Sequence, residues 1–439
     1  MGSYIPSTKK ERQGMLETIG LRTMDDLYAD VPASVQLKRL PDAPDGLSEL
    51  EVVQKMTAMA ERNHVFKTIL RGAGAYDHYI PAIVDSVTSK EEFSTTYTPY
   101  QAEISQGVLQ SIFEYQTMIC ELTGMDVSNA SVYDGASAAA EAVMMSVDRK
   151  RTKVFSAASV HPDVLATIKT YCWAKDLELH LIPEADGLVD MDALKEALTI
   201  ETACVYIQQP NFLGLIENAS AIGQAVHGAG AKFIMGVNPI SLGIMHSPRE
   251  SGADIAVGEG QPLGLPLSFG GPYLGFMATT KAMMRMMPGR IVGQTRDSRG
   301  QRAFVLTLQA REQHIRREKA SSNICSNQAL CAMRASVYLV AVGPQGLRKA
   351  AQLCYSKAHY LAEELCKLPG FKLIYDGAFF NEFVTTLPLP AEKIENALMN
   401  RDILAGLPVN EGMLWCVTEK VSKEKLDETV QTIRGVYTK

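Results

Sequence analysis

Residues 232–258 hold two short apolar runs, Lys232-Phe-Ile-Met-Gly-Val-Asn238 and Asp254-Ile-Ala-Val-Gly258. Runs of this length without polar alternation are typical of strands buried on both faces of a parallel sheet. Outward from them, similar runs alternate with helical patterns across residues 61–310. This alternation predicts an α/β domain with a mostly parallel sheet, covered on both faces, with its sites at the carboxyl ends of the strands. We expect strands at 153–156, 177–182, 204–208, 232–237, 254–257 and 273–278, and helices at 105–123, 136–149, 162–174, 191–198 and 219–227.

The segments on either side of this domain have different patterns. Residues 1–60 are polar and helical in tendency, with breaks at Pro32, Pro41 and Pro44, which predicts an arm that lies on another surface. Residues 311–439 begin with two long helical stretches, 327–342 and 344–367, followed by shorter apolar runs and two further helices. We therefore predict three parts: an arm at 1–60, a large α/β domain at 61–310, and linking helices with a small α+β domain at 311–439.

Composition excludes several functional classes. The 439 residues are 46% hydrophobic with a net charge of -6, and no Lys/Arg-rich run stands out, so we expect no nucleic-acid partner. No apolar stretch reaches the length of a membrane span, and the N-terminus resembles no signal peptide. Eight cysteines are scattered without a CxxC pair, which favours a reducing cytoplasm; Cys325, in a polar stretch, is the one to watch for reactivity.

Three groups of polar residues are candidates for recognition or chemistry. Tyr97, Tyr100 and Gln101 surround Pro99 just before a helix, where they could form a wall of an active site or simply pack. Arg316, Arg317 and Lys319 form a basic cluster that could bind an acidic carrier domain or a substrate carboxylate, although interleaved Glu312 and Glu318 are equally typical of a solvated helix face. Asp134-Gly-Ala-Ser137 opens a helix and could bind phosphate or serve only as the cap of that helix. Apart from these groups, His78 could be an acid–base group, but its context favours a hydrogen-bonded structural histidine.

Several long segments, in order along nearly the whole chain, carry a family resemblance. The chain resembles subunit 1, the α chain, of the two-gene form of the glycine-cleavage P-protein. One departure is Ala102, where the family commonly has proline. The matching segments are Gly72-Ala-Gly-Ala-Tyr-Asp-His-Tyr-Ile-Pro81, Tyr97-Thr-Pro-Tyr-Gln101, Glu103-Ile-Ser-Gln-Gly107, Gln116-Thr-Met-Ile-Cys-Glu-Leu-Thr-Gly124, Asn129-Ala-Ser-Val-Tyr-Asp-Gly135, Gly258-Glu-Gly-Gln-Pro-Leu-Gly264 and Lys319-Ala-Ser-Ser-Asn-Ile-Cys325.

The resemblance implies the fold of type-I pyridoxal-phosphate enzymes and a cofactor held by a second chain. Against that frame, Met235 stands where an aspartate would pair with the pyridinium nitrogen, and Gln261 stands where a lysine would form the Schiff base. The family therefore implies a partner, subunit 2 or β, that carries pyridoxal phosphate, and further assembly into a heterotetramer. Together the subunits decarboxylate glycine, release CO2 and transfer the aminomethyl group to the lipoyl arm of H-protein.

Two alternatives stay open from the residues alone. The chain could be a self-sufficient pyridoxal aminotransferase or decarboxylase that uses another lysine, such as Lys281 or Lys319. It could also be a non-catalytic scaffold that binds a carrier protein. No pattern of metal ligands was found, so we expect no metal site.

Overall fold

The computed structural model describes residues 6–37, 39, 42–95, 97–320, 322–324, 327–410 and 412–437. Pro41 and Cys325 lie outside these ranges. Contacts divide the chain into two units, Met1–His64 and Val65–Lys439. Within the described residues, no helix is both long and apolar enough to cross a bilayer. The three-part division predicted at residues 60 and 310 stays a prediction.

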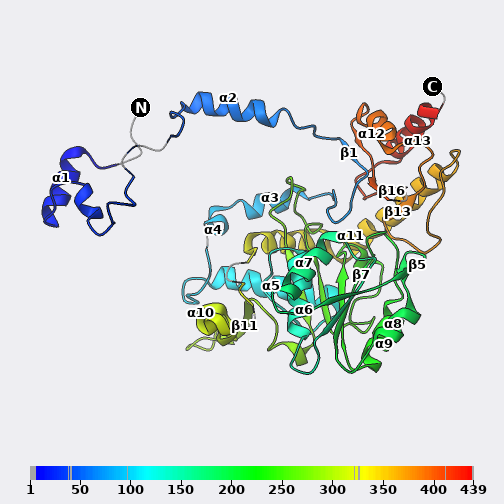
Figure 1. Ribbon diagram of the computed structural model, residues 1–439, viewed down its shortest axis with the longest axis horizontal. Coiled ribbons are helices and arrows are strands. Elements are labelled where there is room, and N and C mark those ends of the chain that lie inside the picture. The colour runs from blue at the N-terminus through cyan, green and yellow to red at the C-terminus, as the bar shows by residue number, and fades with distance from the viewer. Residues whose placement is uncertain are drawn as a thin grey trace. The chain divides into compact units, whose positions relative to one another are not determined.

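The first unit contains α1 (Lys9–Thr18), the 3-10 helix η1 (Asp25–Tyr28) and α2 (Glu49–Ala60) (Figure 1). Thr8 with Glu11 caps α1, and Ser48 with Glu51 caps α2, each by a reciprocal capping box. Leu16 is the one buried apolar side chain among the described residues of this unit. Local capping therefore starts these helices, but the unit has almost no core of its own.

The second unit is built on a seven-stranded sheet with the strand order β2-β10-β9-β8-β7-β3-β4 (Figure 1). Strand β10 is antiparallel to β2 and β9, and the other neighbouring strands are parallel. The predicted fold class is therefore confirmed. The strands of this sheet are β2 (Val127–Ser128), β3 (Lys153–Ala157), β4 (Leu179–Ile182), β7 (Thr202–Gln209), β8 (Lys232–Val237), β9 (Ile255–Glu259) and β10 (Gly275–Thr279).

Helices pack against this sheet because their apolar faces match its buried strands. Helix α6 contacts β8, β9 and β10, and its buried alanines, including Ala138 and Ala139, allow close approach. Short pieces join these elements: β5 (Glu184–Ala185) pairs with β6 (Leu188–Val189), and η2 (Ser241–Gly243) and η3 (Lys281–Met283) follow β8 and β10. The helices are α3 (Ala82–Thr88), α4 (Glu91–Ser94), α5 (Gln106–Thr123), α6 (Gly135–Ser146), α7 (Pro162–Trp173), α8 (Met191–Ala197) and α9 (Ala219–Gly228).

A β-hairpin that the sequence analysis missed lies beside α5. Strands β11 (Ile291–Arg296) and β12 (Arg302–Thr307) pair antiparallel, and Val292 and Phe304 pack with Leu109 of α5 in a separate small core. After the hairpin come η4 (Gln309–Arg311), α10 (Gln313–Arg316) and η5 (Arg317–Lys319). The hairpin thus places the basic cluster next to the Tyr100 loop, because Phe304 exchanges two hydrogen bonds with Gln106 at the start of α5.

The last third of the chain forms the linking helices and a small sheet. Helix α11 (Ala329–Cys366) is interrupted at Gly343, where φ is 60° and Pro344 follows, so the two predicted helices are confirmed on either side. A three-stranded antiparallel sheet, ordered β13-β16-β15, packs with α12 and α13, while β1 pairs with β14. Beside β13, Leu373 forms an isolated bridge with Thr385. These elements are β1 (Thr68–Ile69), β13 (Glu382–Thr385), α12 (Ala391–Met399), β14 (Ile403–Leu404), β15 (Leu407–Val409), β16 (Gly412–Cys416) and α13 (Lys423–Tyr437).

Candidate functional site

A cavity of about 300 Å³ opens at the carboxyl ends of β7, β8 and β9, where an α/β sheet usually has its site. Gln208 comes from β7, Asn238 follows β8, and Glu259 ends β9. The segment around Ala73–Tyr76 and the small domain's Glu382 complete the wall. The location agrees with the prediction from strand alternation.

The amino end of α6 faces this cavity, and two carboxylates of the chain already occupy it. Glu259 Oε2 accepts a hydrogen bond from Gly135 N–H at 2.9 Å, and Asp134 Oδ1 accepts one from Ser137 N–H at 2.7 Å. Glu259 Oε1 accepts two more, from the N–H groups of Gln261 and Leu274, both at 2.9 Å. A Cβ on residue 135 would come within 2.8 Å of Glu259 N, so glycine there permits the close approach. Carboxyl groups of the chain itself therefore lie at the amino end of the helix, the position suited to a phosphate.

Gln261 and Met235 are both buried, but neither side chain lines the cavity. The Gln261 amide accepts from Tyr76 N–H and donates to the carbonyls of Tyr76 and Leu265, at distances of 2.8–2.9 Å. Met235 packs in the main core, and the end of β8 presents Asn238 to the cavity instead. The hydrogen bonds of Gln261 therefore join the segment before α3 to the loop after β9.

The residues of this cavity do not fit pyridoxal phosphate. The cofactor needs an amine for its Schiff base, an acidic partner for its ring nitrogen and cationic or N–H donors for its phosphate. None of the described residues that line the cavity is a lysine or arginine, and the N–H groups of Gly135 and Ser137, in the first turn of α6, already donate to Glu259 and Asp134. Burial raises the pKa of Glu259 to about 7, against the opposing effect of its N–H donors. A phosphate would meet carboxylates where it needs donors.

A second cavity, of about 370 Å³, brings together two groups that were predicted separately. Tyr100 and Arg317 both line it, with Arg290 and Glu312 deeper in its wall. Arg290 Nη2 donates to the Tyr100 hydroxyl at 2.8 Å, and its guanidinium carbon lies 5.2 Å from the centre of the Tyr100 ring. The candidate loop and the candidate basic cluster therefore meet at one cavity.

The other predicted residues of these groups lie outside its lining. Tyr97 is 80% exposed, and Gln101 and Lys319 are exposed as well. Arg316 is exposed and donates through Nε to the Ala310 carbonyl. Sequence reasoning missed the burial of Arg290 and Glu312, because nothing in their local pattern distinguishes them from surface charges and tertiary contacts bury them.

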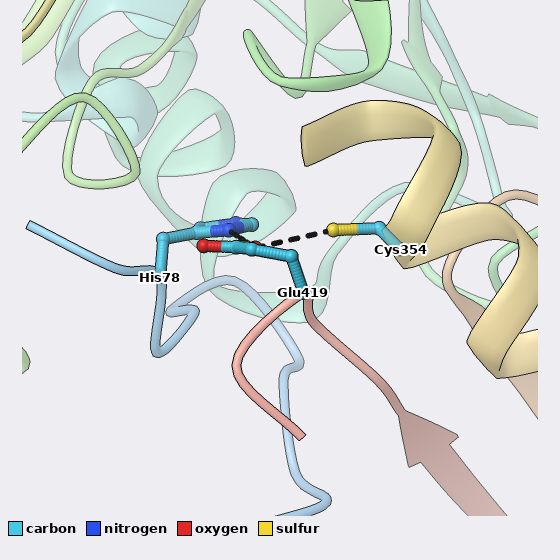
Figure 2. Close-up of side chains that lie close together, drawn as sticks. All are labelled: His78, Cys354 and Glu419. Atoms are coloured by element: carbon cyan, nitrogen blue, oxygen red, sulfur yellow. Dashed lines mark hydrogen bonds and ion pairs between the residues drawn. The ribbon is translucent and has the colours of Figure 1, made fainter. Parts of the chain in front are cut away.

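His78, Glu419 and Cys354 form a buried polar cluster where three segments meet (Figure 2). Their ligand atoms lie within 4.8 Å of one another, a spacing that a metal ion could bridge. However, one oxygen of Glu419 pairs with His78 Nδ1 at 2.7 Å and accepts from Cys354 Sγ at 3.4 Å, and burial raises the pKa of the Cys354 thiol. A protonated thiol is a poor zinc ligand, so hydrogen bonding accounts for the cluster.

Beyond His78, Tyr79 N–H donates to the second oxygen of Glu419 at 2.6 Å. Burial acts to raise the pKa of Glu419, but the hydrogen bond and charge of His78 and the Tyr79 N–H together lower it to about 2. Cys354 lies on α11 and Glu419 follows β16, so the cluster joins the loop before α3 to the linking helix and the small domain. The predicted structural interpretation of His78 agrees with these contacts.

The fold first defines a class. A sphingosine-1-phosphate lyase from Burkholderia pseudomallei K96243 superposes with a TM-score of 0.68 at 13% identity, over 93% of this chain and 95% of that chain. At that identity the likeness shows the fold alone, which is that of type-I pyridoxal-phosphate enzymes.

Closer matches define the family. The model of the glycine cleavage system P-protein matches residues 2–433. A curated relative from Desulfitobacterium hafniense, "Probable glycine dehydrogenase (decarboxylating) subunit 1", is 50% identical over 438 residues, which span 98% of each chain. A crystal structure of glycine decarboxylase (P-protein) in inhibitor-bound form has a TM-score of 0.93 at 40% identity and covers 99% of this chain and 100% of that chain. The chain belongs to the glycine cleavage system P-protein family.

Proposed function

We propose that this chain is the subunit of glycine dehydrogenase (decarboxylating) that holds no cofactor, and that it works with a second subunit that holds pyridoxal phosphate. The pair decarboxylates glycine, releases CO2 and transfers the aminomethyl group to the lipoyl arm of H-protein. One observation carries the proposal. This chain belongs to the family, yet the described lining of its strand-end cavity contains no lysine, and Glu259 accepts the Gly135 N–H that a phosphate would need. Pyridoxal phosphate supplies the electron sink for decarboxylation, so a second chain must provide it.

The two alternative lysines do not reach the strand-end cavity. Lys281 follows β10, which runs antiparallel to β9 and pairs Thr279 with Ile255 at the amino end of β9. Lys281 therefore lies beyond the amino ends of the parallel strands, whereas the cavity lies at their carboxyl ends. Lys319 is exposed in η5 and is not among the residues lining the cavity. Both placements favour the subunit over a self-sufficient enzyme.

The first unit supports a large interface with the partner. Its described residues bury one apolar side chain, and the apolar residues of α2 are exposed. Exposed apolar surface of this extent is typical of surface that a partner covers, and obligate interfaces often bury more than about 2,000 Å². The exposed apolar residues are Met15, Ile19, Met24, Leu27, Tyr28, Val31, Val35, Leu37, Leu47, Leu50, Val52, Val53, Met56 and Met59.

Deletion of residues 1–64 tests that interface. We expect the truncated chain to keep the fold of its second unit, because no described residue before Leu70 belongs to a core of that unit, but to lose co-purification with subunit 2. Retention of unchanged affinity would show that the arm is not part of the interface. Near-native circular dichroism of the truncated chain is the control for folding.

The second cavity fits a role at the shared active site. Tyr100 and Arg317 line it, while Tyr97 and Gln101 keep exposed side chains that a partner could cover. We place Tyr97, Tyr100 and Gln101 in the wall of the partner's site, and Arg316, Arg317 and Lys319 in contact with the acidic carrier or a carboxylate. We also place the assembly, a heterotetramer of two subunits of each kind, in the cytoplasm.

Reconstitution tests the proposed function. Each subunit alone should show no exchange of the glycine carboxyl group with bicarbonate, and the mixture with lipoyl H-protein should show it. A chain that catalyses the exchange alone would support the self-sufficient alternative. If subunit 2 is fully active without this chain, this chain is a non-catalytic scaffold.

A further inference from the structure

Two buried side chains of the strand-end cavity carry polar atoms that the chain itself does not use. Tyr206 of β7 is 3% exposed, and Asn381, directly before β13, is 1% exposed. Among the described residues, the Tyr206 hydroxyl and the Asn381 amide oxygen have no hydrogen-bond partner, yet both atoms keep accessible surface and both residues line the cavity. Buried polar groups without a protein partner need a water, an ion or a ligand.

Neighbouring residues hold these two atoms at the cavity wall. The Tyr206 oxygen lies over the backbone of Gly236, where a Cβ would collide with it, and Gly236 lines the cavity too. Asn381 Nδ2 donates to Cys416 Sγ at 3.5 Å, which leaves the amide oxygen to face the cavity. Both atoms are therefore fixed acceptors at the edge of an open space.

The charge of this cavity is negative and has no counter-ion. Glu259 and Glu382 line it, and burial raises the pKa of each to about 7. The described lining contains no lysine or arginine. His161 Nδ1 accepts from Asp163 N–H at 3.1 Å, and its Nε2 lies 2.8 Å from the Ala73 carbonyl, which is the pattern of a neutral ring with its proton on Nε2. Carboxylates removed from water are normally paired with a cation, so the cation has to come from a ligand.

The acceptors of the cavity come from separate elements. Glu259 ends β9 and Tyr206 lies on β7, with β8 between them, so their backbones are about 10 Å apart at the usual strand spacing. Glu382 belongs to β13 of the small sheet, and neither carboxyl group raises the pKa of the other. This separation suits a ligand with two polar ends better than a single small ion.

We propose that the strand-end cavity binds a short aliphatic diamine in its dicationic form. One ammonium group pairs with Glu259, whose Oε2 accepts from a single described donor, the Gly135 N–H. The other ammonium group donates to the Tyr206 hydroxyl and the Asn381 amide oxygen, with the charge of Glu382 next in the chain. An ammonium group has three donors and no acceptor, which matches a wall of acceptors without cations.

The rest of the lining selects against other ligands. The carbon chain of a diamine packs against apolar side chains, those of Val164, Val237 and Pro262. An α-amino acid or a phosphate brings a negative charge to a cavity whose charged groups are carboxylates, so both bind poorly. A hard divalent metal ion needs about six oxygen ligands around one point, whereas these acceptors lie apart. The ligand is therefore distinct from the substrate of the proposed function.

Calorimetric titration of the full chain near pH 8, above the pKa of about 7 of both carboxyl groups, tests the site. We expect 1,4-diaminobutane to bind with a Kd on the order of 1 mM or tighter. Butylammonium and 4-aminobutan-1-ol carry one charge each and should bind at least about 5-fold more weakly, and glycine should not saturate the site. Butylammonium binding as tight as the diamine would overturn the proposal, as would displacement of the diamine by equimolar Mg²⁺, or no saturable binding of the diamine up to roughly ten times that Kd.

Variants locate the two ends of the ligand. Tyr206→Phe removes a hydroxyl without a partner in the chain, so the melting temperature should hold while diamine binding weakens about 5-fold and butylammonium binding does not change. Glu259→Gln should weaken the binding of both amines about 10-fold, whereas Tyr355→Phe, a change on α11, should alter neither. Unchanged diamine affinity in Tyr206→Phe would overturn the proposal even if Glu259→Gln fails to fold. Because the titration uses this chain alone, its outcome is independent of whether the reconstituted pair shows exchange activity.

Discussion

Replacing Glu259 tests whether this carboxylate substitutes for a phosphate at the amino end of α6. Glu259→Ala leaves three N–H groups, of Gly135, Gln261 and Leu274, without their acceptor. Each unpaired buried donor costs about 1–3 kcal/mol, and removal of a desolvated carboxyl group returns part of that. We therefore expect the free energy of unfolding to fall by about 3–5 kcal/mol, at the upper end of single-residue effects.

Urea titration of wild type and variant measures that loss. Adding inorganic phosphate then tests whether the position that Glu259 leaves empty binds a phosphate. If the emptied position resembles a phosphate site, inorganic phosphate should restore part of the variant's stability and leave the wild type unchanged. Glu103→Ala, a change of an exposed glutamate, is the matched control and should cost less than about 0.5 kcal/mol. A loss below about 1 kcal/mol, or equal stabilisation of both proteins by phosphate, would refute the reasoning.

Three further predictions concern titration and turnover. Burial raises the pKa of Glu382 from 4.5 to about 7. Its protonated form therefore stabilises the fold below pH 4.5, and this contribution, roughly 3 kcal/mol, is lost as the pH rises towards 7. In urea titrations, the free energy of unfolding of Glu382→Gln should depend less on pH over this range. The pKa of Glu419 is lowered to about 2, so its contribution is present above pH 4.5 and is lost as the pH falls towards 2; Glu419→Gln should therefore lose stability at neutral pH and show less further loss on acidification, and an unchanged acid limb would contradict this. In the reconstituted complex, Tyr97→Phe and Tyr100→Phe should each lower turnover about 10-fold, or 1.4 kcal/mol. The melting temperature should change little in Tyr97→Phe, whereas Tyr100→Phe also removes the acceptor of buried Arg290 Nη2 and should lower it. Tyr355→Phe, a half-exposed tyrosine on α11, is the control, and a parallel loss of stability and activity in Tyr97→Phe would make the loop structural.

The strands at the centre of the sheet were predictable because they are short, apolar and buried on both faces. Strand β8 runs over 232–237 as expected, and α12 occupies Ala391–Met399. The break at Gly343 followed from Pro344. The β11–β12 hairpin was missed although residues 297–301 contain turn residues, because its strands alternate weakly and pack on a small separate core.

The candidate sites depended on contacts that sequence patterns do not carry. That Gln261 stands in place of a lysine stays a prediction; its hydrogen bonds to Tyr76, a residue far away in the chain, could not be read from the sequence. Glu259 sits in Gly258-Glu-Gly260 at the end of a buried strand, a signal that could have identified it as a strand-end carboxylate. Arg290 and Glu312 gave no such signal, since only tertiary packing buries them.

The central claim is that this chain holds no cofactor and its partner does. Borohydride reduction of the assembled complex, followed by peptide mapping of both chains, tests it most directly, because reduction fixes the cofactor to the lysine that bears it. The account predicts one pyridoxyl-lysine in each copy of subunit 2 and none in this chain. Recovery of a pyridoxyl group on a lysine of this chain, near one per chain, would contradict it.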